Sequence, residues 1–388
     1  MIKILYVHTH TPTRAVAEAL NRAGYEVIMY PKKENGIFLQ DEIIEEIVSY
    51  IQENHITHMV SISLIYNLAM AAYKAQIKYL CLQWDAPSYN LYSPFGRMDN
   101  CYFTVFDKVD YERLVGKAVP HVLYQPLSID INAAAWWNAR KKNYLHDISF
   151  VGSLYDDNLY DNYMQNIPEA LQQYFNSIFD EAAFRWDGVN RIYGKTGKDV
   201  LAYIKASCPG FELINPFDID DIQYFEAYYL ARKLANIERI CILNLLAEEH
   251  EVTFYTGSKK AISKLQNVKV MPFVNDRTEA PAVFNGSKIN LNITLKSIEG
   301  GTPQRVMDIM ESGGFVLTTY CPETAELFEE DKEIVMFKTP EELMDKVDYY
   351  LVHDEERQKI AAAGHAKVLR CYTWDIKMRE FMKWVEEQ

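Results

Sequence analysis

The stretch Glu299–Phe315 constrains the fold of this chain more than any other. Its sequence, EGGTPQRVMDIMESGGF, reads as a glycine loop, a helix, a glycine stop and the first residue of a strand, FVLTTY. Thr302 is a favourable N-cap, and Pro303 suits the first helical position because the N–H that proline lacks would have no partner there. Gly313 and Gly314 end the helix. In an α/β sheet this order places backbone N–H groups and the positive end of a helix dipole at the sheet edge, where an anionic group can bind.

The N-terminal part alternates strands and helices. Ile4–Val7 is predicted as a strand, Arg14–Ala23 as a helix that Gly24 ends, and Tyr25–Tyr30 as the next strand. This order is typical of an open parallel α/β sheet. The intervening loop, HTHTPT, lacks the glycines of a dinucleotide fingerprint, which argues against a nicotinamide-dependent dehydrogenase.

The same alternation starts a second time further along the chain. A polar segment, Asn138–Asp147, resembles a linker, and Ile148–Ser153 reads as a new strand and glycine turn. Leu154–Glu249 has helical patterning with many aromatic residues and is interpreted as a helical insertion, after which strands resume at Val252. The prediction is two doubly wound parallel-sheet domains, residues 1–140 and 141–372, followed by a last segment, 373–388.

Composition excludes several classes of partner. The formal net charge of -14 and the pI of about 5.2 argue against nucleic acid and anionic membrane surfaces. No apolar run reaches the length of about 18 residues that a membrane span needs, and Met1–Val7 is too short for a signal peptide. The six cysteines form no CxxC pair, as expected for reduced residues and not for disulfides or zinc ligands. A cytoplasmic protein is expected.

Several segments together resemble one family. They are LQWDAPSYNLYS, NCYFTVFDK and VLYQPLSID in the first half, and ISFVGSLYDDN, EVTFYTG and the long run from GGTPQRVMDIMESGG to RCYTW in the second. The chain from about residue 79 onward is similar to the CgeB-like spore-maturation branch of the group 1 glycosyltransferases, best over 286–374. The resemblance implies the GT-B fold: two Rossmann-like domains facing a cleft, an acceptor on the first, a nucleotide-sugar donor on the second, and a final helix, 373–388, that crosses back. It also implies that neither a metal nor another cofactor is needed.

The resemblance places the donor diphosphate at the opening stretch. Gly300 and Gly301 allow close approach of the backbone, and the amides of Thr302, Pro303 and Gln304 mark the helix start, although proline itself offers no N–H. Arg305 would add a charged contact to the phosphates. The alternative is that Arg305 only pairs with Asp308 or Glu311 on the helix surface.

Related enzymes carry two glutamates around this loop, the first near the donor sugar and the second on the ribose hydroxyls. Asp308 takes the second place, and a carboxylate there can still accept two hydroxyl hydrogen bonds. The first place falls on Gly300, so the neighbouring Glu299 becomes the candidate for the sugar-proximal acid.

Two more segments complete the expected donor site. Gly152 is followed by Ser153 where relatives often carry an arginine, so the positive charge must come from another residue: Arg305, Lys296, Lys259 or Lys260. Gly152 as a simple turn is the alternative. Tyr255 and Gly257 after one strand, and Phe273 after the next, are candidates for contact with the base, whose identity the sequence does not reveal; Tyr255 as a core residue is the alternative.

On the acceptor side, Asp85 follows a predicted strand and is a candidate general base, with an Asx turn as the alternative. His8 and His10, after the first strand, are alternative bases or phosphate contacts, and Asp107 is a further acid at the cleft edge.

The leading interpretation is a metal-independent glycosyltransferase that uses a nucleotide-diphosphate sugar, with UDP-sugars expected first. Its acceptor, a glycan, a protein or a small molecule, is unidentified. Two alternatives are a nucleotide-sugar epimerase of the same fold and a catalytically inactive nucleotide-sugar-binding protein. The insertion could shape the acceptor site, form a homodimer contact or only pack.

Overall fold

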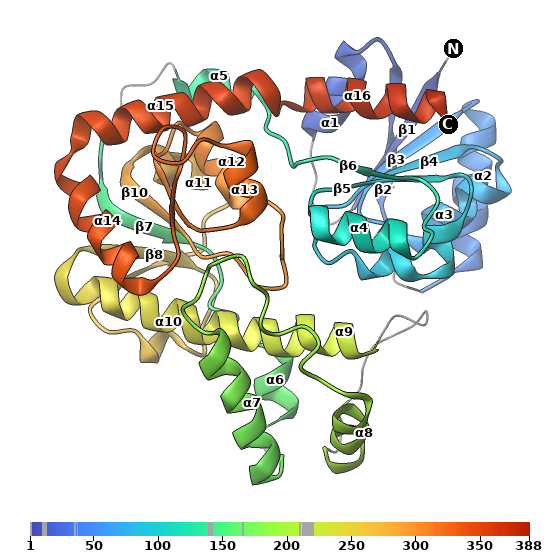
Figure 1. Ribbon diagram of the computed structural model, residues 1–388. Coiled ribbons are helices and arrows are strands. Elements are labelled where there is room, and N and C mark those ends of the chain that lie inside the picture. The colour runs from blue at the N-terminus through green and yellow to red at the C-terminus, as the bar shows by residue number, and fades with distance from the viewer. Residues whose placement is uncertain are drawn as a thin grey trace. The chain divides into compact units, whose positions relative to one another are not determined.

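The computed structural model describes residues 2–9, 14–34, 36, 38–138, 143–164, 167–208, 211 and 221–388 (Figure 1). The chain divides into two compact units. The first unit holds Met1–Ile131 and Cys371–Gln388, and the second unit is built from the chain between Asn132 and Arg370. None of the helices in the described ranges is long and apolar enough to cross a membrane.

The first unit is an open sheet of six parallel strands in the order β2-β1-β3-β4-β5-β6. The strands are β1 (Lys3–His8), β2 (Glu26–Lys33), β3 (His58–Ile62), β4 (Lys78–Leu82), β5 (Cys101–Val105) and β6 (Val122–Tyr124). The helices are α1 (Arg14–Arg22), α2 (Asp41–Glu53), α3 (Tyr66–Lys74), α4 (Lys108–Gly116) and, from the far end of the chain, α16 (Trp374–Glu387). The helix α5 (Ile131–Asn138) follows this part of the chain.

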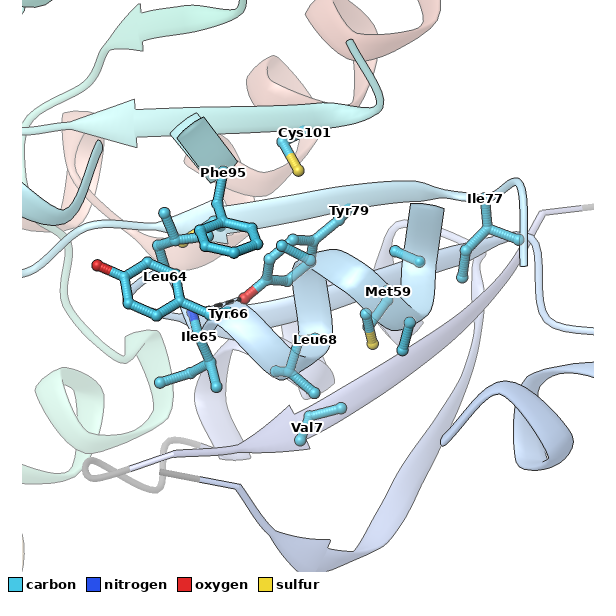
Figure 2. Close-up of a cluster of buried hydrophobic side chains, with 14 of the residues drawn as sticks. Val7, Met59, Leu64, Ile65, Tyr66, Leu68, Ile77, Tyr79, Phe95 and Cys101 are labelled. Atoms are coloured by element: carbon cyan, nitrogen blue, oxygen red, sulfur yellow. Dashed lines mark hydrogen bonds between the residues drawn. The ribbon is translucent and has the colours of Figure 1, made fainter. Parts of the chain in front are cut away.

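Side chains alternate between the two faces of this sheet, as the strand period of two requires. Leu5 and Val7 of β1 face α2 and α3, in a core where the Tyr79 hydroxyl lies 2.6 Å from the Ser61 hydroxyl and accepts a hydrogen bond from the Ile65 N–H (Figure 2). The intervening residues face the second core, under α1 and α16.

The last helix, α16, completes the first unit. Its buried side chains are Trp374, Met378, Phe381, Met382 and Val385, which pack with the apolar face of α1. The helix enters through a short parallel bridge between Ile129 and Thr373, and Arg22 of α1 forms two hydrogen bonds with the carboxylate of Asp375, of 2.6 and 2.9 Å. It begins at Trp374, where the Thr373 hydroxyl caps it by accepting a hydrogen bond from the Ile376 N–H.

The second unit has a six-stranded parallel sheet in the order β12-β11-β10-β7-β8-β9. The strands are β7 (His146–Val151), β8 (Val252–Thr256), β9 (Lys269–Pro272), β10 (Ser287–Asn292), β11 (Val316–Thr319) and β12 (Val335–Phe337). The helices that follow them are α11 (Ala280–Asn285), α12 (Gln304–Glu311), α13 (Pro322–Leu327), α14 (Pro340–Val352) and α15 (Asp354–Cys371). The prediction of two doubly wound parallel sheets is confirmed.

A group of helices between β7 and β8 extends away from this sheet (Figure 1). They are α6 (Leu159–Tyr163), α7 (Glu169–Ala182), α8 (Lys198–Ser207), α9 (Asp221–Phe225), a π-helical turn (Glu226–Leu230) and α10 (Ala231–Glu249). The first helices share an aromatic core of their own around Phe175, Phe225 and Tyr229. The second half of α10 leaves it and packs on the sheet through Ile242 and Leu246. The last part of the predicted insertion, Leu154–Glu249, thus packs in the core of the sheet.

Candidate functional site

The strand order of the second unit defines where a ligand is expected. From β7 the chain passes outward to β8 and β9 on one side, whereas β10, β11 and β12 lie on the other. The loops that follow β7 and β10 therefore diverge at the carboxyl ends of the strands, which is the position where open α/β sheets bind ligands. Gly152 and Ser153 directly follow β7, and the segment from Thr294 to Pro303 follows β10. Two of the predicted donor segments thus border this switch point.

The glycine loop is anchored through its backbone and Thr302. Gly300 and Gly301 are buried, and the Cys321 thiol donates a hydrogen bond of 2.7 Å to the Gly300 carbonyl. Thr302 is buried, and its hydroxyl lies 2.9 Å from the hydroxyl of Thr324 in α13. The prediction that Thr302 caps the helix is therefore wrong: α12 begins at Gln304, with Pro303 as its N-cap at φ -69° and ψ 151°.

Arg305 lies in the first turn of α12 beside two acids. Its Nη2 is 3.0 Å from Asp276 Oδ1, its Nη1 is 3.8 Å from Asp308 Oδ2, and the guanidinium lies over the Phe284 ring. Asp308 also accepts a hydrogen bond of 2.8 Å from Gln304 Nε2. Burial raises the pKa of Asp308, and the charge of Arg305 opposes this shift. The expected phosphate and ribose residues are thus adjacent, and the alternative pairing with Asp308 is present as well.

The loop after β7 accepts a hydrogen bond from an arginine that the sequence interpretation missed. Ser153 is exposed, and its hydroxyl accepts a hydrogen bond of 2.8 Å from the Tyr155 N–H. Its carbonyl accepts one of 2.6 Å from Nη1 of Arg239, whose Nη2 donates another of 2.6 Å to the Ile293 carbonyl beyond β10. Arg239 lies among apolar residues on the buried face of α10, and an arginine at such a position was the signal available in the sequence.

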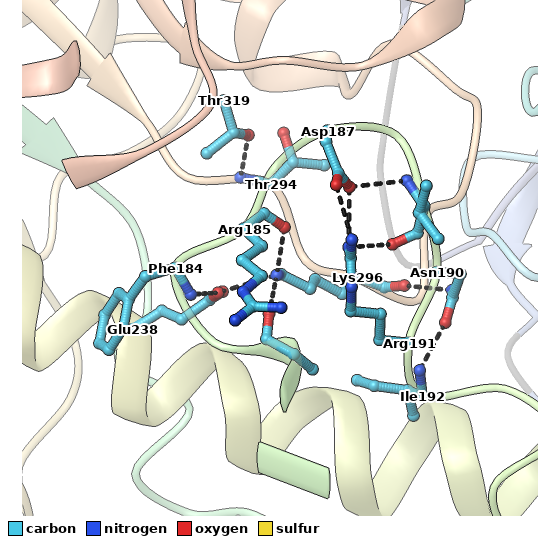
Figure 3. Close-up of polar contacts among 12 residues, drawn as sticks. Phe184, Arg185, Asp187, Asn190, Arg191, Ile192, Glu238, Thr294, Lys296 and Thr319 are labelled. Carbon is cyan, nitrogen blue, oxygen red and sulfur yellow. Dashed lines mark hydrogen bonds and ion pairs between the residues drawn. The ribbon is translucent and has the colours of Figure 1, made fainter. Parts of the chain in front are cut away.

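The lysines proposed as alternative phosphate contacts are otherwise engaged or exposed. The ammonium of Lys296 donates hydrogen bonds to the carbonyls of Ala182 and Arg185 and lies 3.0 Å from the Glu238 carboxylate (Figure 3). Lys260 forms an exposed ion pair of 2.6 Å with Asp157, and Lys259 is exposed. Lys296 is thus committed to holding the segment around Arg185 against the loop that follows β10.

Glu299 borders a small pocket within the second unit. The pocket has a volume of about 50 Å³ and lies where the insertion meets the loops that follow β10 and β11. Its lining residues are Arg185, Trp186, Gly188, Val189, Asn190, Thr294, Leu295, Lys296, Ile298, Glu299, Thr319, Tyr320, Cys321 and Pro322. The insertion therefore forms one wall beside the candidate sugar-proximal acid.

The candidate base contacts separate into two groups. The Tyr255 hydroxyl lies 3.0 Å from Nε2 of His146, the first residue of β7, whereas the backbone of Tyr255 pairs with the last residue of β7. Its side chain thus points away from the carboxyl edge, which favours the alternative that Tyr255 is a structural residue. Gly257 and Phe273 remain neighbours on that edge: a Cβ built on Gly257 would lie 3.9 Å from Phe273 Cβ, and Phe273 is 63% exposed.

In the first unit, the acids after β4 and β5 differ in role. Asp85 is exposed in the loop after β4, where its carbonyl accepts a hydrogen bond of 3.1 Å from the Ser88 hydroxyl. Asp107 is buried and caps α4, accepting hydrogen bonds from the amides of Val109 and Asp110, so its carboxylate has a structural role.

His8 ends β1, and burial together with the charges of Lys33 and Arg14 lowers its pKa. His10 lies outside the described residues. Within the described ranges, no three His, Cys, Asp or Glu side chains are grouped so that they could hold a metal ion.

Comparison with known proteins gives similar folds at low sequence identity. Sucrose-phosphate synthase from Thermosynechococcus elongatus has a TM-score of 0.55 and 9% identity, with 100% of both chains covered. The Anabaena protein HepE in complex with UDP-glucose has a TM-score of 0.55 and 10% identity, again with 100% of both chains covered. A glycosyltransferase from Rickettsia africae has a TM-score of 0.51 and 11% identity, with 100% of this chain and 99% of that one covered.

Among sequences, no curated protein matches the chain. A family model described as "Glycosyl transferase-like" matches residues 232–383, which include α10, the glycine loop and α12. The chain therefore has the GT-B fold, and its C-terminal part matches the glycosyl transferase-like family.

Proposed function

We propose that this protein is a metal-independent glycosyltransferase of the CgeB-like branch, acting in the cytoplasm on a nucleotide-diphosphate sugar, in the first instance a UDP-sugar. One observation carries the proposal: the segments after β7 and β10 that were selected as donor contacts border the same switch point, and the second lies in the part of the chain that matches the family. The bound UDP-glucose of HepE, a protein of the same fold, makes a UDP-sugar the first donor to test.

In the proposed reaction, the diphosphate lies at the loop from Gly300 to Arg305. Breaking the bond between the sugar and the diphosphate leaves negative charge on the phosphate oxygens, which the N-terminal end of α12 and the Arg305 guanidinium would stabilise. Asp308 would accept hydrogen bonds from the ribose hydroxyls, displacing its present contact with Gln304.

Glu299 would lie beside the transferred sugar. An acceptor hydroxyl would attack the anomeric carbon and pass its proton to a base, for which Asp85 and His10 are the candidates. The donor-binding loop would form no covalent bond with the substrate. Positioning of the substrates and stabilisation of charge would therefore supply most of the rate enhancement.

A thermal-shift screen with UDP-, GDP-, TDP- and CDP-sugars tests the donor. At least one should raise the melting temperature, since a ligand at 100 times its Kd adds roughly 2.7 kcal/mol. Calorimetry on Arg305→Ala and Asp308→Ala should then show affinity for the selected nucleotide falling by about tenfold or more, as loss of a charged hydrogen bond predicts. Lys332→Ala, an exposed site in the same unit, should bind normally. Normal binding by both site variants would overturn the assignment.

Product analysis separates transferase from the other activities. Release of the nucleoside diphosphate that depends on an added acceptor supports transfer. Conversion of the donor to another sugar without any acceptor would indicate an epimerase, and binding without turnover in the presence of candidate acceptors would indicate a binding protein.

A further inference from the structure

The guanidinium of Arg239 connects the two strands that border the switch point. Its Nη1 and Nη2 each donate a hydrogen bond of 2.6 Å, one to the Ser153 carbonyl after β7 and the other to the Ile293 carbonyl after β10. Arg239 itself belongs to α10 and is only 8% exposed. A buried guanidinium therefore connects the loops that follow β7 and β10 at the switch point.

This charge has no carboxylate partner within the described part of the chain. Nη1 and Nη2 donate to neutral carbonyls, and Tyr155 is a further, uncharged hydrogen-bond partner. The guanidinium lies against the rings of Phe150 and Tyr155, and Nε has no hydrogen-bond partner. The adjacent Glu238 also acts on Arg239, but its Oε1 accepts from the Phe184 N–H and lies against Lys296. Burial lowers the pKa of Arg239, and the positive charge of Arg305 adds to this effect. A buried cation whose neighbouring carboxylate is shared with Lys296 favours binding of an anion nearby.

Gly152 lies beside this charge. A Cβ built on Gly152 would lie 3.7 Å from Nη1 of Arg239 and 3.4 Å from the Phe150 ring. A larger side chain at residue 152 would therefore lie over the guanidinium. Ser153, next in the chain, is exposed, so a ligand that contacts this loop reaches the neighbourhood of Nη1.

We propose that Arg239 supplies the positive charge for the donor diphosphate on the β7 side of the switch point, in place of the cation that Ser153 does not provide. This inference rests on the proposed function and makes it more specific: the diphosphate lies between Arg239 and Arg305. The hydrogen bonds to the two carbonyls orient Arg239, and its charge attracts the phosphates.

The test compares a nucleoside diphosphate with its nucleoside. UDP and uridine, or the pair with the base selected by the thermal-shift screen, are titrated into the wild type, Arg239→Gln and Arg239→Lys. Arg239→Gln should weaken UDP binding by tenfold or more and uridine binding by less than about threefold, since only UDP carries phosphates. Arg239→Lys should retain most of the UDP affinity, and added salt should weaken UDP binding less in Arg239→Gln than in the wild type.

Arg232→Gln is the matched control, because Arg232 lies on the same helix with its guanidinium over the Tyr228 ring. It should change neither affinity. If Arg239→Gln does not fold, Gly152→Val provides the test, because this variant keeps Arg239 but covers its guanidinium. The affinity for UDP should then fall while the affinity for uridine persists. If the variant loses affinity equally for UDP and uridine, or loses none for either, Arg239 has only a structural role. The proposed function would then still stand. A wild type that binds no nucleotide at all would overturn both.

Discussion

At the residue scale, the loop that carries Asp85 depends on a buried acid. Asp110, only 2% exposed, accepts a hydrogen bond of 2.8 Å from the Ser88 N–H and another of 3.3 Å from the Tyr92 hydroxyl. Burial raises the pKa of Asp110 to about 6. The candidate acceptor-side loop is therefore held by a carboxyl group that titrates near neutral pH.

This raised pKa predicts the effect of Asp110→Asn on stability. Because the folded pKa of about 6 lies above the ordinary aspartate pKa of 3.8, the folded state binds this proton more tightly than the unfolded state. The contribution of Asp110 to the free energy of unfolding therefore falls as pH rises from about 4 to 6, by up to about 3 kcal/mol. Urea denaturation at several pH values should show a flatter profile for the variant over this window, and Asp99→Asn, at an exposed site, should follow the wild type. Parallel profiles for Asp110→Asn and the wild type would contradict the prediction.

Residue-scale contacts were the least predictable part of the site. The sequence identified Arg305 and Asp308 because both lie in a recognisable loop and helix. It did not identify Arg239, whose partners at Ser153 and Ile293 are distant in the chain. It also left Lys296 open as one of four possible phosphate contacts, although that ammonium binds carbonyls of the insertion. Such partners are chosen by the tertiary structure, which local patterns do not encode.

At the element scale, local signals predicted which segments form helices and strands, and neighbouring segments set where they begin. Thr302 has the properties of an N-cap, yet its hydroxyl lies against Thr324 and the helix begins later. His146 and Asp147 appeared to belong to a polar linker but are the first residues of β7, where they are only half-buried. Polar residues at strand ends do not show the apolar pattern by which a strand is recognised.

At Gly364 in the helix α15, intrinsic helix propensity and side-chain packing predict opposite effects of a substitution on stability. Replacing Gly364 with alanine should favour an isolated helix by roughly 1 kcal/mol. In the folded protein, however, a Cβ at residue 364 would lie 2.4 Å from the Glu333 carbonyl oxygen. We therefore expect Gly364→Ala to destabilise the protein by about 1–3 kcal/mol. The measurement is the unfolding midpoint in urea.

Gly116→Ala is the matched control for this prediction. Gly116 ends α4, and a Cβ there would meet nothing within 4 Å. Its replacement should be neutral or stabilising by up to about 1 kcal/mol. A stabilising effect of both substitutions would show that the segment around Glu333 moves aside at little cost.

At the scale of the whole molecule, the first unit is assembled from distant parts of the chain. It needs α16, whose apolar side chains complete the core over α1. Each buried side chain of this size contributes about 1.5–3 kcal/mol, so the helix as a whole contributes an amount comparable with the stability of a typical domain, about 5–15 kcal/mol.

Ending the chain after Tyr372 should therefore unfold the first unit and leave the second folded. Hydrogen exchange followed by mass spectrometry should show lost protection in β1 and α1, with protection kept in β7 and β10. Asp375→Asn is the graded comparison: it weakens the ion pair with Arg22 and should cost only about 1 kcal/mol. Full protection of β1 in the truncated chain would contradict the assigned role of α16.

The dependence of the first unit on α16 also sets an order of events on the ribosome. Domains usually fold as they emerge, N-terminal first, while the chain grows by about 5–20 residues per second. Here the strands β1 to β6 emerge long before α16, the helix that covers α1. Their apolar surface therefore stays uncovered while the entire second unit is synthesised. Nascent chains of this protein are therefore expected to complete their later-made unit first and to need protection by chaperones until α16 has been translated.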